Sequence, residues 1–235
     1  MNKKYQNLKE KVYKANMDLV NKGLVIYTFG NVSQIDRENG IIAIKPSGVT
    51  YDKLKPDDIV LLDLKGNLID TSLKPSSDTK THLKLYNKFK DIGAVVHTHS
   101  KYVTAFAQAK LPIKCLGTTH ADYFYGDIPC TDIISDEMLA KDYEEETGSL
   151  IVDTFRKLNI DYRLMKACLV ACHGPFTWGD NAEEAVFISD ILEEIAKQNY
   201  ITHTLNPATE SIKLTLMNKH YFRKHGKNAY YGQKL

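Results

Sequence analysis

The histidines are the residues of this 235-residue chain whose type and spacing point most directly to chemistry. His97 and His99 lie on either side of Thr98, directly after the apolar residues 94–96. Alternate residues of a β-strand face the same side, so both imidazole rings can approach one ion. Neutral imidazole is the commonest protein ligand for zinc and similar cations. The spacing therefore predicts a metal site, and two hydrogen-bonded histidines at a strand end remain the alternative.

His173 is the third candidate ligand. It ends a second predicted strand, 168–172, just before a turn expected at Gly174-Pro175. Three protein ligands and one open position form the arrangement of a catalytic zinc site, although no spacing rule connects His173 with His97. Three other histidines have no comparable setting and are expected at the surface: His82, His203 and His225.

Alternating helix and strand patterns must position these side chains. Leu8, Val12, Ala15 and Leu19 fall at helical spacing and predict an amphipathic first helix over 1–20. Hairpins followed by strand–helix alternation indicate an α/β domain in which helices cover a mixed sheet. Strands are predicted at 25–29, 32–36, 41–45, 59–64, 67–69, 94–96, near 114 and 123, and at 168–172, and helices at 77–89, 101–108, 137–158, 182–198 and 210–223.

Composition places the chain among ordinary globular proteins. Hydrophobic residues make up 43% and charged residues 26%, and the net charge of +2 argues against a nucleic-acid surface. No apolar run approaches the length that spans a membrane, and the N-terminus lacks the apolar centre of a secretion signal. We therefore expect a cytoplasmic protein with reduced cysteines, in which Cys172 serves packing.

Further motifs occur along the whole chain. They are Gly30–Ser33, Lys45–Val49, Lys74–Thr79, Val96–Ser100, Gly117–Gly126, His173–Phe176, Lys219–Gly226 and Ala229–Gln233. In number, order and spacing these motifs resemble the class II aldolase/epimerase (adducin-like) family, and within it the sugar-phosphate 4-epimerases. The resemblance implies one domain over 1–235, a three-layer αβα fold with a mixed, mostly antiparallel central sheet, and a homotetramer with active sites shared between subunits.

The resemblance also implies the site residues. His97, His99 and His173 would hold Zn²⁺, or Mn²⁺ or Co²⁺, with Asp78 at or near the metal. Asp122 and Tyr231 match the acid/base pair, with Tyr231 supplied by a neighbouring subunit. The substrate and its phosphate would contact Gly30, Asn31, Lys45, Ser47, Gly48, Ser76, Ser77, Asp78 and Thr118, together with His220 and Arg223 from the shared site.

The physical character of these residues is compatible with both a phosphate site and simpler roles. Gly30 and Gly48 permit close backbone approach, and a helix start near Ser77 adds partial positive charge. An ordinary turn is the alternative for residues 45–48, and helix capping is the alternative for Ser77 and Asp78. Asp122 could instead cap a turn, although burial could raise its pKa. His120 could orient Asp122 or merely pack, and Tyr231 could be a tail residue.

The implied reaction interconverts L-ribulose 5-phosphate and D-xylulose 5-phosphate. The ketone is at C2, so C4 cannot be inverted by simple deprotonation. No Gly-x-Gly-x-x-Gly dinucleotide motif is present for oxidation. A histidine-bound cation suits the other route, which is retro-aldol cleavage of C3–C4 to an enediolate and glycolaldehyde phosphate followed by re-addition. Proton transfer on two faces needs two groups, which favours an acid/base pair.

Two other functions fit the resemblance. A class II sugar-phosphate aldolase of the L-fuculose-1-phosphate type shares the fold and the metal site, but uses glutamate where Asp78 stands. An adducin-like interaction protein would be catalytically inactive, which the complete histidine set argues against. Epimerases of arabinose catabolism and those serving ascorbate-type sugars look nearly alike at these motifs.

Overall fold

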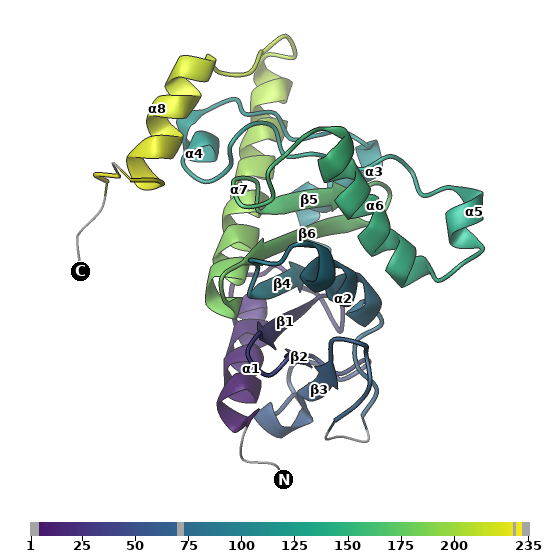
Figure 1. Ribbon diagram of the computed structural model, residues 1–235. Helices are drawn as coiled ribbons and strands as arrows, with labels where there is room; N and C mark the ends of the chain where they lie inside the picture. Colours follow the sequence, from purple (N-terminus) through teal and green to yellow (C-terminus); the bar gives the residue numbers. More distant parts are fainter. Residues whose placement is uncertain (1–4, 70–72, 228, 232–235) are drawn as a thin grey trace.

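A computed structural model describes residues 5–69, 73–227 and 229–231. Its centre is a six-stranded sheet in the order β3-β2-β1-β4-β6-β5, in which all the named strands pair antiparallel (Figure 1). The strands are β1 (Asn31–Asp36), β2 (Ile41–Ile44), β3 (Val60–Asp63), β4 (Ala94–His97), β5 (Ala167–Val170) and β6 (Gly174–Gly179). The expected sheet is confirmed, with its parallel component reduced to an isolated bridge between Cys130 and Leu169.

Helices cover both faces of this sheet. The longer ones are α1 (Gln6–Asn21), α2 (Thr79–Lys88), α3 (Lys101–Ala109), α6 (Tyr143–Lys157), α7 (Ala182–Leu205) and α8 (Leu214–Lys224), and the short ones are η2 (Pro56–Asp58), α4 (Thr118–Ala121) and α5 (Asp136–Leu139). Helices α1 and α7 pack on one face and α2 and α6 on the other (Figure 1). The three-layer αβα arrangement is therefore confirmed.

The alternation of side chains in β4 explains these layers. Val95 belongs to the cluster that contains Tyr86 of α2 and Phe155 of α6. Its neighbour Val96 points to the opposite face and packs in the cluster with Leu19 of α1. Because both faces are apolar, β4 must lie in the middle of the sheet, and its last residue, His97, is buried at the sheet's end.

Several predicted elements were wrong. Residues 25–29 form a turn in which Tyr27 has a φ of 55°, and Tyr123 lies just after the helical turn α4 and not in a strand. The strands predicted at 67–69 and near 114 are reduced to isolated bridges, from Leu68 to Leu62 and from Ile113 to Ile128. The predicted turn at Gly174-Pro175 is instead the start of β6. Pro175 disfavours a strand because it lacks an N–H, but its carbonyl oxygen accepts hydrogen bonds from the Thr98 amide and the His97 ring.

Cys172 and His82 also differ from expectation. Cys172 does not pack in a strand, because it is exposed in the turn between β5 and β6 with a φ of 65°. His82 of α2 is fully buried, and its Nδ1 lies 2.7 Å from the Ser33 hydroxyl. That hydroxyl lies 2.7 Å from the phenol oxygen of Tyr86, so a buried polar chain gives the His82 Nδ1 a partner, whereas Nε2 has none within the described residues.

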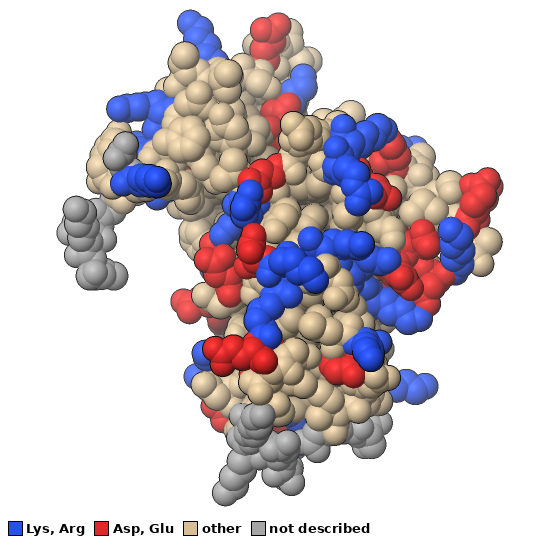
Figure 2. Space-filling model, viewed as in Figure 1, with Lys and Arg blue, Asp and Glu red and all other residues tan. Residues whose placement is uncertain are grey.

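On the face seen in Figure 2, Lys and Arg side chains gather near the middle of the molecule, with Asp and Glu side chains beside them. His203 is only partly exposed on α7, and His225 is half-buried because its Nε2 lies 2.8 Å from the Asp122 carbonyl oxygen. None of the helices in the described part of the chain is long and apolar enough to cross a membrane.

Candidate active site

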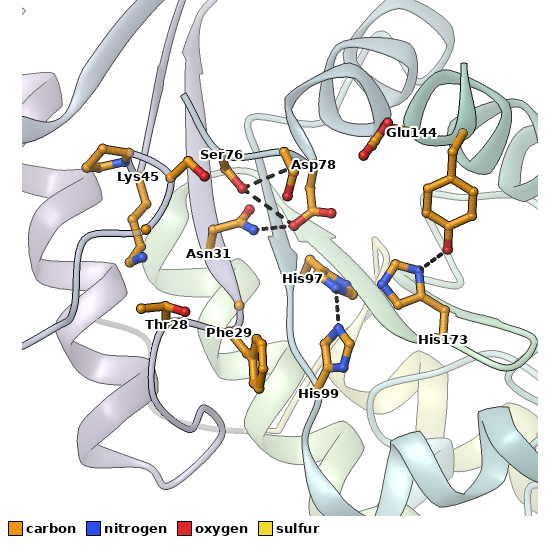
Figure 3. A pocket seen from close by; sticks show the side chains of 16 residues that line it. Thr28, Phe29, Asn31, Lys45, Ser76, Asp78, His97, His99, Glu144 and His173 are labelled. Carbon is orange, nitrogen blue, oxygen red and sulfur yellow. Dashed lines mark hydrogen bonds between the residues drawn. The ribbon is translucent and has the colours of Figure 1, made fainter. Parts of the chain in front are cut away.

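Three histidines meet at the end of the central strands. One ligand nitrogen from each of His97, His99 and His173 lies within 4.8 Å of the other two, and the Nε2 atoms of His97 and His99 are 3.0 Å apart (Figure 3). His97 ends β4, His99 is the second residue after the strand, and His173 lies in the turn between β5 and β6. The antiparallel pairing of β4 with β6 brings the third histidine to the first two.

The environment suits neutral imidazoles. Burial, together with the charge of neighbouring histidines, lowers the pKa of His99, and it lowers the pKa of His173 to about 4. The His97 Nδ1 lies 2.9 Å from the carbonyl oxygen of Pro175, which can only accept, so this nitrogen carries the proton and Nε2 is free to coordinate. Three neutral nitrogens converging on one point fit a divalent cation.

Asp78 lines the same cavity but is not within the 4.8 Å group. It is the N-cap residue of α2, yet its side chain does not cap the helix, so the capping interpretation is wrong. Its Oδ2 instead accepts a hydrogen bond of 2.7 Å from Asn31 (Figure 3). Burial works to raise the pKa of Asp78, but His97, His82 and the Asn31 bond outweigh it and lower the pKa, which keeps the group a carboxylate.

The residues predicted to bind phosphate are all brought together with the histidines. They line one cavity of about 400 Å³: Gly30, Asn31, Lys45, Ser47, Gly48, Ser76 and Ser77. Gly30 has a φ of +86°, and a Cβ there would lie 2.6 Å from Val25 and 3.0 Å from the His97 carbonyl oxygen. Only glycine therefore fits this place, where the chain passes directly behind the histidines.

Lys45 is the dominant cation at this end of the cavity. Lys45 is only 2% exposed, and its ammonium nitrogen lies 4.8 Å from the centre of the Tyr51 ring. Within the described residues it forms no ion pair with a carboxylate, and burial lowers its pKa. A buried ammonium without a counter-ion is a strong recognition group for an anionic ligand.

Five residues of this cavity were not predicted as site residues: Thr28, Phe29, Pro46, Tyr143 and Glu144, of which only Pro46 falls in a motif noted in the sequence. Phe29 stacks on His99 with ring centres 5.8 Å apart. Thr28 and Phe29 fall in a segment predicted as a strand, so their orientation could not be deduced. Tyr143 and Glu144 begin α6, far along the chain, and no motif marked them.

A second group of functional candidates gathers around Asp122. Arg223 of α8 binds both carboxylate oxygens, with the shortest distance 2.8 Å, and His220 lies 3.0 Å from Oδ1. Lys224 lies 3.4 Å from Oδ2. This acid–base cluster, defined as Asp122, His220, Arg223, Lys224 and Tyr231, does not line the histidine cavity.

The pKa of Asp122 is shifted in the direction opposite to the one that burial alone would give. Burial works to raise its pKa, but hydrogen bonds from Arg223 and His220 and the charge of Lys224 outweigh burial and lower the pKa. The carboxylate is therefore ready to accept a proton rather than to donate one. Local sequence could not show this, because the cations come from about one hundred residues away.

Tyr231 and Thr118 lie in the same region as Asp122. The Arg223 guanidinium is 4.6 Å from the Tyr231 ring centre, and the Tyr231 amide donates to the Arg223 carbonyl oxygen at 3.0 Å. The Tyr231 residue is 58% exposed. Thr118 is exposed at the start of α4, where its carbonyl oxygen accepts from the Asp122 amide at 2.9 Å. Gly232 and Gln233 lie outside the described residues.

His120 packs and does not orient Asp122. Its Nε2 lies 2.8 Å from the Gly126 carbonyl oxygen, its ring contacts Phe124, and burial lowers its pKa to about 4. The unfolded chain, with an ordinary histidine pKa near 6.5, binds a proton more readily than the native protein. His120 therefore makes stability fall as the pH drops from about 6.5 towards 4, by about 1.4 kcal/mol per pH unit.

We expect His120→Gln to remove the contribution of His120 to the pH dependence of stability. Chemical denaturation of metal-free protein at pH 7.5 and 5 should show a free energy of unfolding that decreases between these pH values by roughly 2 kcal/mol more in wild type than in the variant. Equal decreases in the two proteins would show that His120 is not the titrating group.

Fold and cavity together define a class II aldolase-like domain in which three histidines that could hold a metal ion share a cavity with a buried lysine. The profile described as "Class II Aldolase and Adducin N-terminal domain" matches residues 10–200. The chain is 51% identical over 229 residues to "L-ribulose-5-phosphate 4-epimerase UlaF" of Salmonella paratyphi C and of Salmonella choleraesuis, a match that covers 97% of this chain and 100% of each relative. This chain belongs to the class II aldolase/adducin family.

Solved structures share the fold of this chain. The fold is similar to that of an L-fuculose 1-phosphate aldolase, with a TM-score of 0.80 and 25% identity over 92% of this chain and 95% of the other. It is also similar to the l-fuculose-1-phosphate aldolase of Thermus thermophilus, with a TM-score of 0.68 and 23% identity over 86% and 98% of the two chains.

Proposed function

We propose that this protein is an L-ribulose-5-phosphate 4-epimerase that interconverts L-ribulose 5-phosphate and D-xylulose 5-phosphate. The observation that carries the proposal is the cavity in which three histidines that could hold a cation lie beside the buried ammonium of Lys45, which pairs with no carboxylate among the described residues. The relatives that are 51% identical over nearly the whole chain, and that carry the epimerase name, support the choice of reaction.

The two ends of the cavity bind different parts of the substrate. Lys45 and Ser47, with the backbone at Gly48, bind and orient the phosphate, while the histidine end receives the ketone and its neighbouring hydroxyl. A divalent cation held by His97, His99 and His173, with Asp78 beside it, would supply Lewis-acid stabilisation of the enediolate that forms when C3–C4 breaks. Glycolaldehyde phosphate remains anchored through its phosphate, turns, and re-adds from the opposite face, which inverts C4.

The C4 oxygen must lose a proton before cleavage and regain one after re-addition. The Asp122 carboxylate is the base on one face. Tyr231 serves the other face as a phenol, a weak acid suited to return a proton to an alkoxide. Both groups lie in one cluster of one chain, held through Arg223, and neither lines that chain's own cavity. We therefore place the whole acid–base cluster at the cavity of a neighbouring subunit.

The remaining features follow as parts of the same proposal. Residues 1–235 form a single domain, and four copies form a homotetramer whose active sites are shared. Zinc is the proposed cation, since three imidazoles and one carboxylate suit it, and manganese or cobalt are the alternatives. The protein acts in the cytoplasm on a small phosphorylated ketopentose, in the catabolism of arabinose or of ascorbate-type sugars.

The alternative function is a sugar-phosphate aldolase of the L-fuculose-1-phosphate type. Asp78 argues against it, because a shorter carboxylate that bonds Asn31 and lies beside the histidines reaches the substrate carbon less well than glutamate would. An adducin-like, inactive protein would not be expected to keep three converging histidines.

Two substrates distinguish these functions directly. Metal-loaded protein should convert L-ribulose 5-phosphate to D-xylulose 5-phosphate and leave L-fuculose 1-phosphate uncleaved. Release of lactaldehyde and dihydroxyacetone phosphate from the second substrate as the main activity would favour the aldolase. Inactivity of metal-loaded protein on both would contradict the proposal.

Lys45→Met tests the phosphate end of the cavity. Loss of a charge-assisted hydrogen bond of about 1.5–3 kcal/mol should raise KM for the phosphorylated ketopentose by roughly 10–150-fold, with a smaller effect on kcat. Lys53→Met, which removes an exposed ammonium outside the cavity, is the matched control and should leave KM unchanged. Wild-type KM in Lys45→Met would remove Lys45 from the phosphate site.

A further inference from the structure

The three histidines differ in what holds their rings. In His97, Nδ1 is fixed by the Pro175 carbonyl oxygen at 2.9 Å. In His173, Nδ1 lies 3.2 Å from the phenol oxygen of Tyr143, the bond drawn from His173 in Figure 3. His99 has the contact of its Nε2 with His97 and ring contacts with Phe29, His97 and His173, but within the described residues no partner for Nδ1. In the part of the chain that the structure describes, Tyr143 is therefore the one side chain that lies within hydrogen-bond distance of the Nδ1 atom of any of these three histidines.

His173 has particular need of such support. It lies in a turn directly after Cys172, whose φ is 65°, whereas His97 is held within the hydrogen-bonded ladder of β4. The backbone of His173 is fixed by one bond from its amide to the Val170 carbonyl oxygen at 3.0 Å. Rotation of the His173 side chain is restrained by the phenol of Tyr143, which belongs to α6.

That element is itself firmly anchored. Tyr143 is the first residue of α6, and α6 is tied to α2 by a hydrogen bond of 2.6 Å from the Thr81 hydroxyl to the Glu144 carbonyl oxygen. An ion pair of 2.9 Å between Lys84 and Glu145 joins the same two helices. Since α2 begins directly after Asp78, one rigid pair of helices positions both Asp78 and Tyr143 against the histidines.

We infer that Tyr143 is a positioning residue for the cation site, with its phenol oxygen accepting the Nδ1 proton of His173 so that Nε2 faces the other two ligands. A ligand histidine that binds through Nε2 must carry its proton on Nδ1, and a buried acceptor there fixes both tautomer and ring orientation. The inference rests on the proposed function only in that His173 holds a cation.

Metal binding to Tyr143→Phe tests this role without any assay of activity. The substitution keeps the ring and removes the acceptor oxygen. Titration of metal-free protein with Zn²⁺ and Co²⁺ should show a Kd about 10–100-fold higher than in wild type, and the visible spectrum of bound Co²⁺ should change. The Tm of the metal-free variant should match wild type, while its rise on adding metal should be smaller.

The control is Tyr162→Phe, which removes another phenol bond, to Asp91 at 3.0 Å, away from the cavity. It should bind both cations like wild type. As a second measurement, ¹⁵N spectra of zinc-loaded wild type should show His173 protonated at Nδ1, with slow proton exchange that becomes fast in Tyr143→Phe. Wild-type affinity and an unchanged Co²⁺ spectrum in Tyr143→Phe would overturn the inference, whereas a wild-type protein that binds metal but does not epimerise would contradict only the proposed function.

Discussion

Replacing Asp122 with asparagine is expected to lower turnover by about 10²–10⁴-fold, the range for lost acid–base help. The variant keeps the size and hydrogen-bonding shape of the side chain but removes its charge. Arg223 and His220 can still contact the amide oxygen, so the cluster should persist. Because Asp122 does not line the histidine cavity, metal content should equal that of wild type. Steady-state kinetics with metal analysis checks both, and near-wild-type kinetics would remove Asp122 from the mechanism.

The same variant tests whether the cluster serves a neighbouring subunit. Asp122→Asn and His97→Asn chains, each strongly impaired alone, should recover activity when co-assembled, because one type supplies the cation site and the other supplies the carboxylate. If each site joins two neighbours at random, about one quarter of the sites are complete. Isolated mixtures that have not exchanged subunits are the control. No recovery in co-assembled protein would mean that Asp122 serves its own chain's cavity.

The second large effect is expected from His97→Asn. Its ring is the most completely buried of the three, and it lies in contact with both other histidines. Removing this ligand should release the cation and remove several kcal/mol of enediolate stabilisation, so that activity falls by at least about 10³-fold. Metal analysis and kinetics on the same preparation check the coupling.

His203→Asn, on α7 outside the histidine cavity, is the control for the loss of a histidine and should keep metal and activity. A His97→Asn protein that lacks metal yet epimerises at the wild-type rate would contradict the metal-dependent mechanism.

The spacing of apolar residues predicted the elements that bury them. In the first helix, Val12 and Leu19 are buried and fall at helical spacing. In β4, the adjacent residues Val95 and Val96 are both buried, which is typical of a strand covered on both faces. Strand β6 was missed because Pro175 and two terminal glycines are typical of turns. It exists because its pairing with β4 and β5 supplies hydrogen bonds that local propensity does not reveal.

The site, too, has features that the sequence predicted and features that only the structure reveals. The spacing of His97 and His99 predicted their convergence, and the structure adds His173 through the order of β4 and β6. The lowered pKa of Asp122 and the role of Tyr143 depend on residues contributed by α8 and α6, which are remote in sequence. Such cross-element contacts follow only from the folded chain.

The most direct test of the central claim is the conversion of L-ribulose 5-phosphate by zinc-loaded protein in D₂O, followed by NMR. Inversion through C3–C4 cleavage predicts D-xylulose 5-phosphate as the main product, formed without added nicotinamide and with the original hydrogen retained at C4. Deuterium at C4, or free glycolaldehyde phosphate as the main product, would contradict the account.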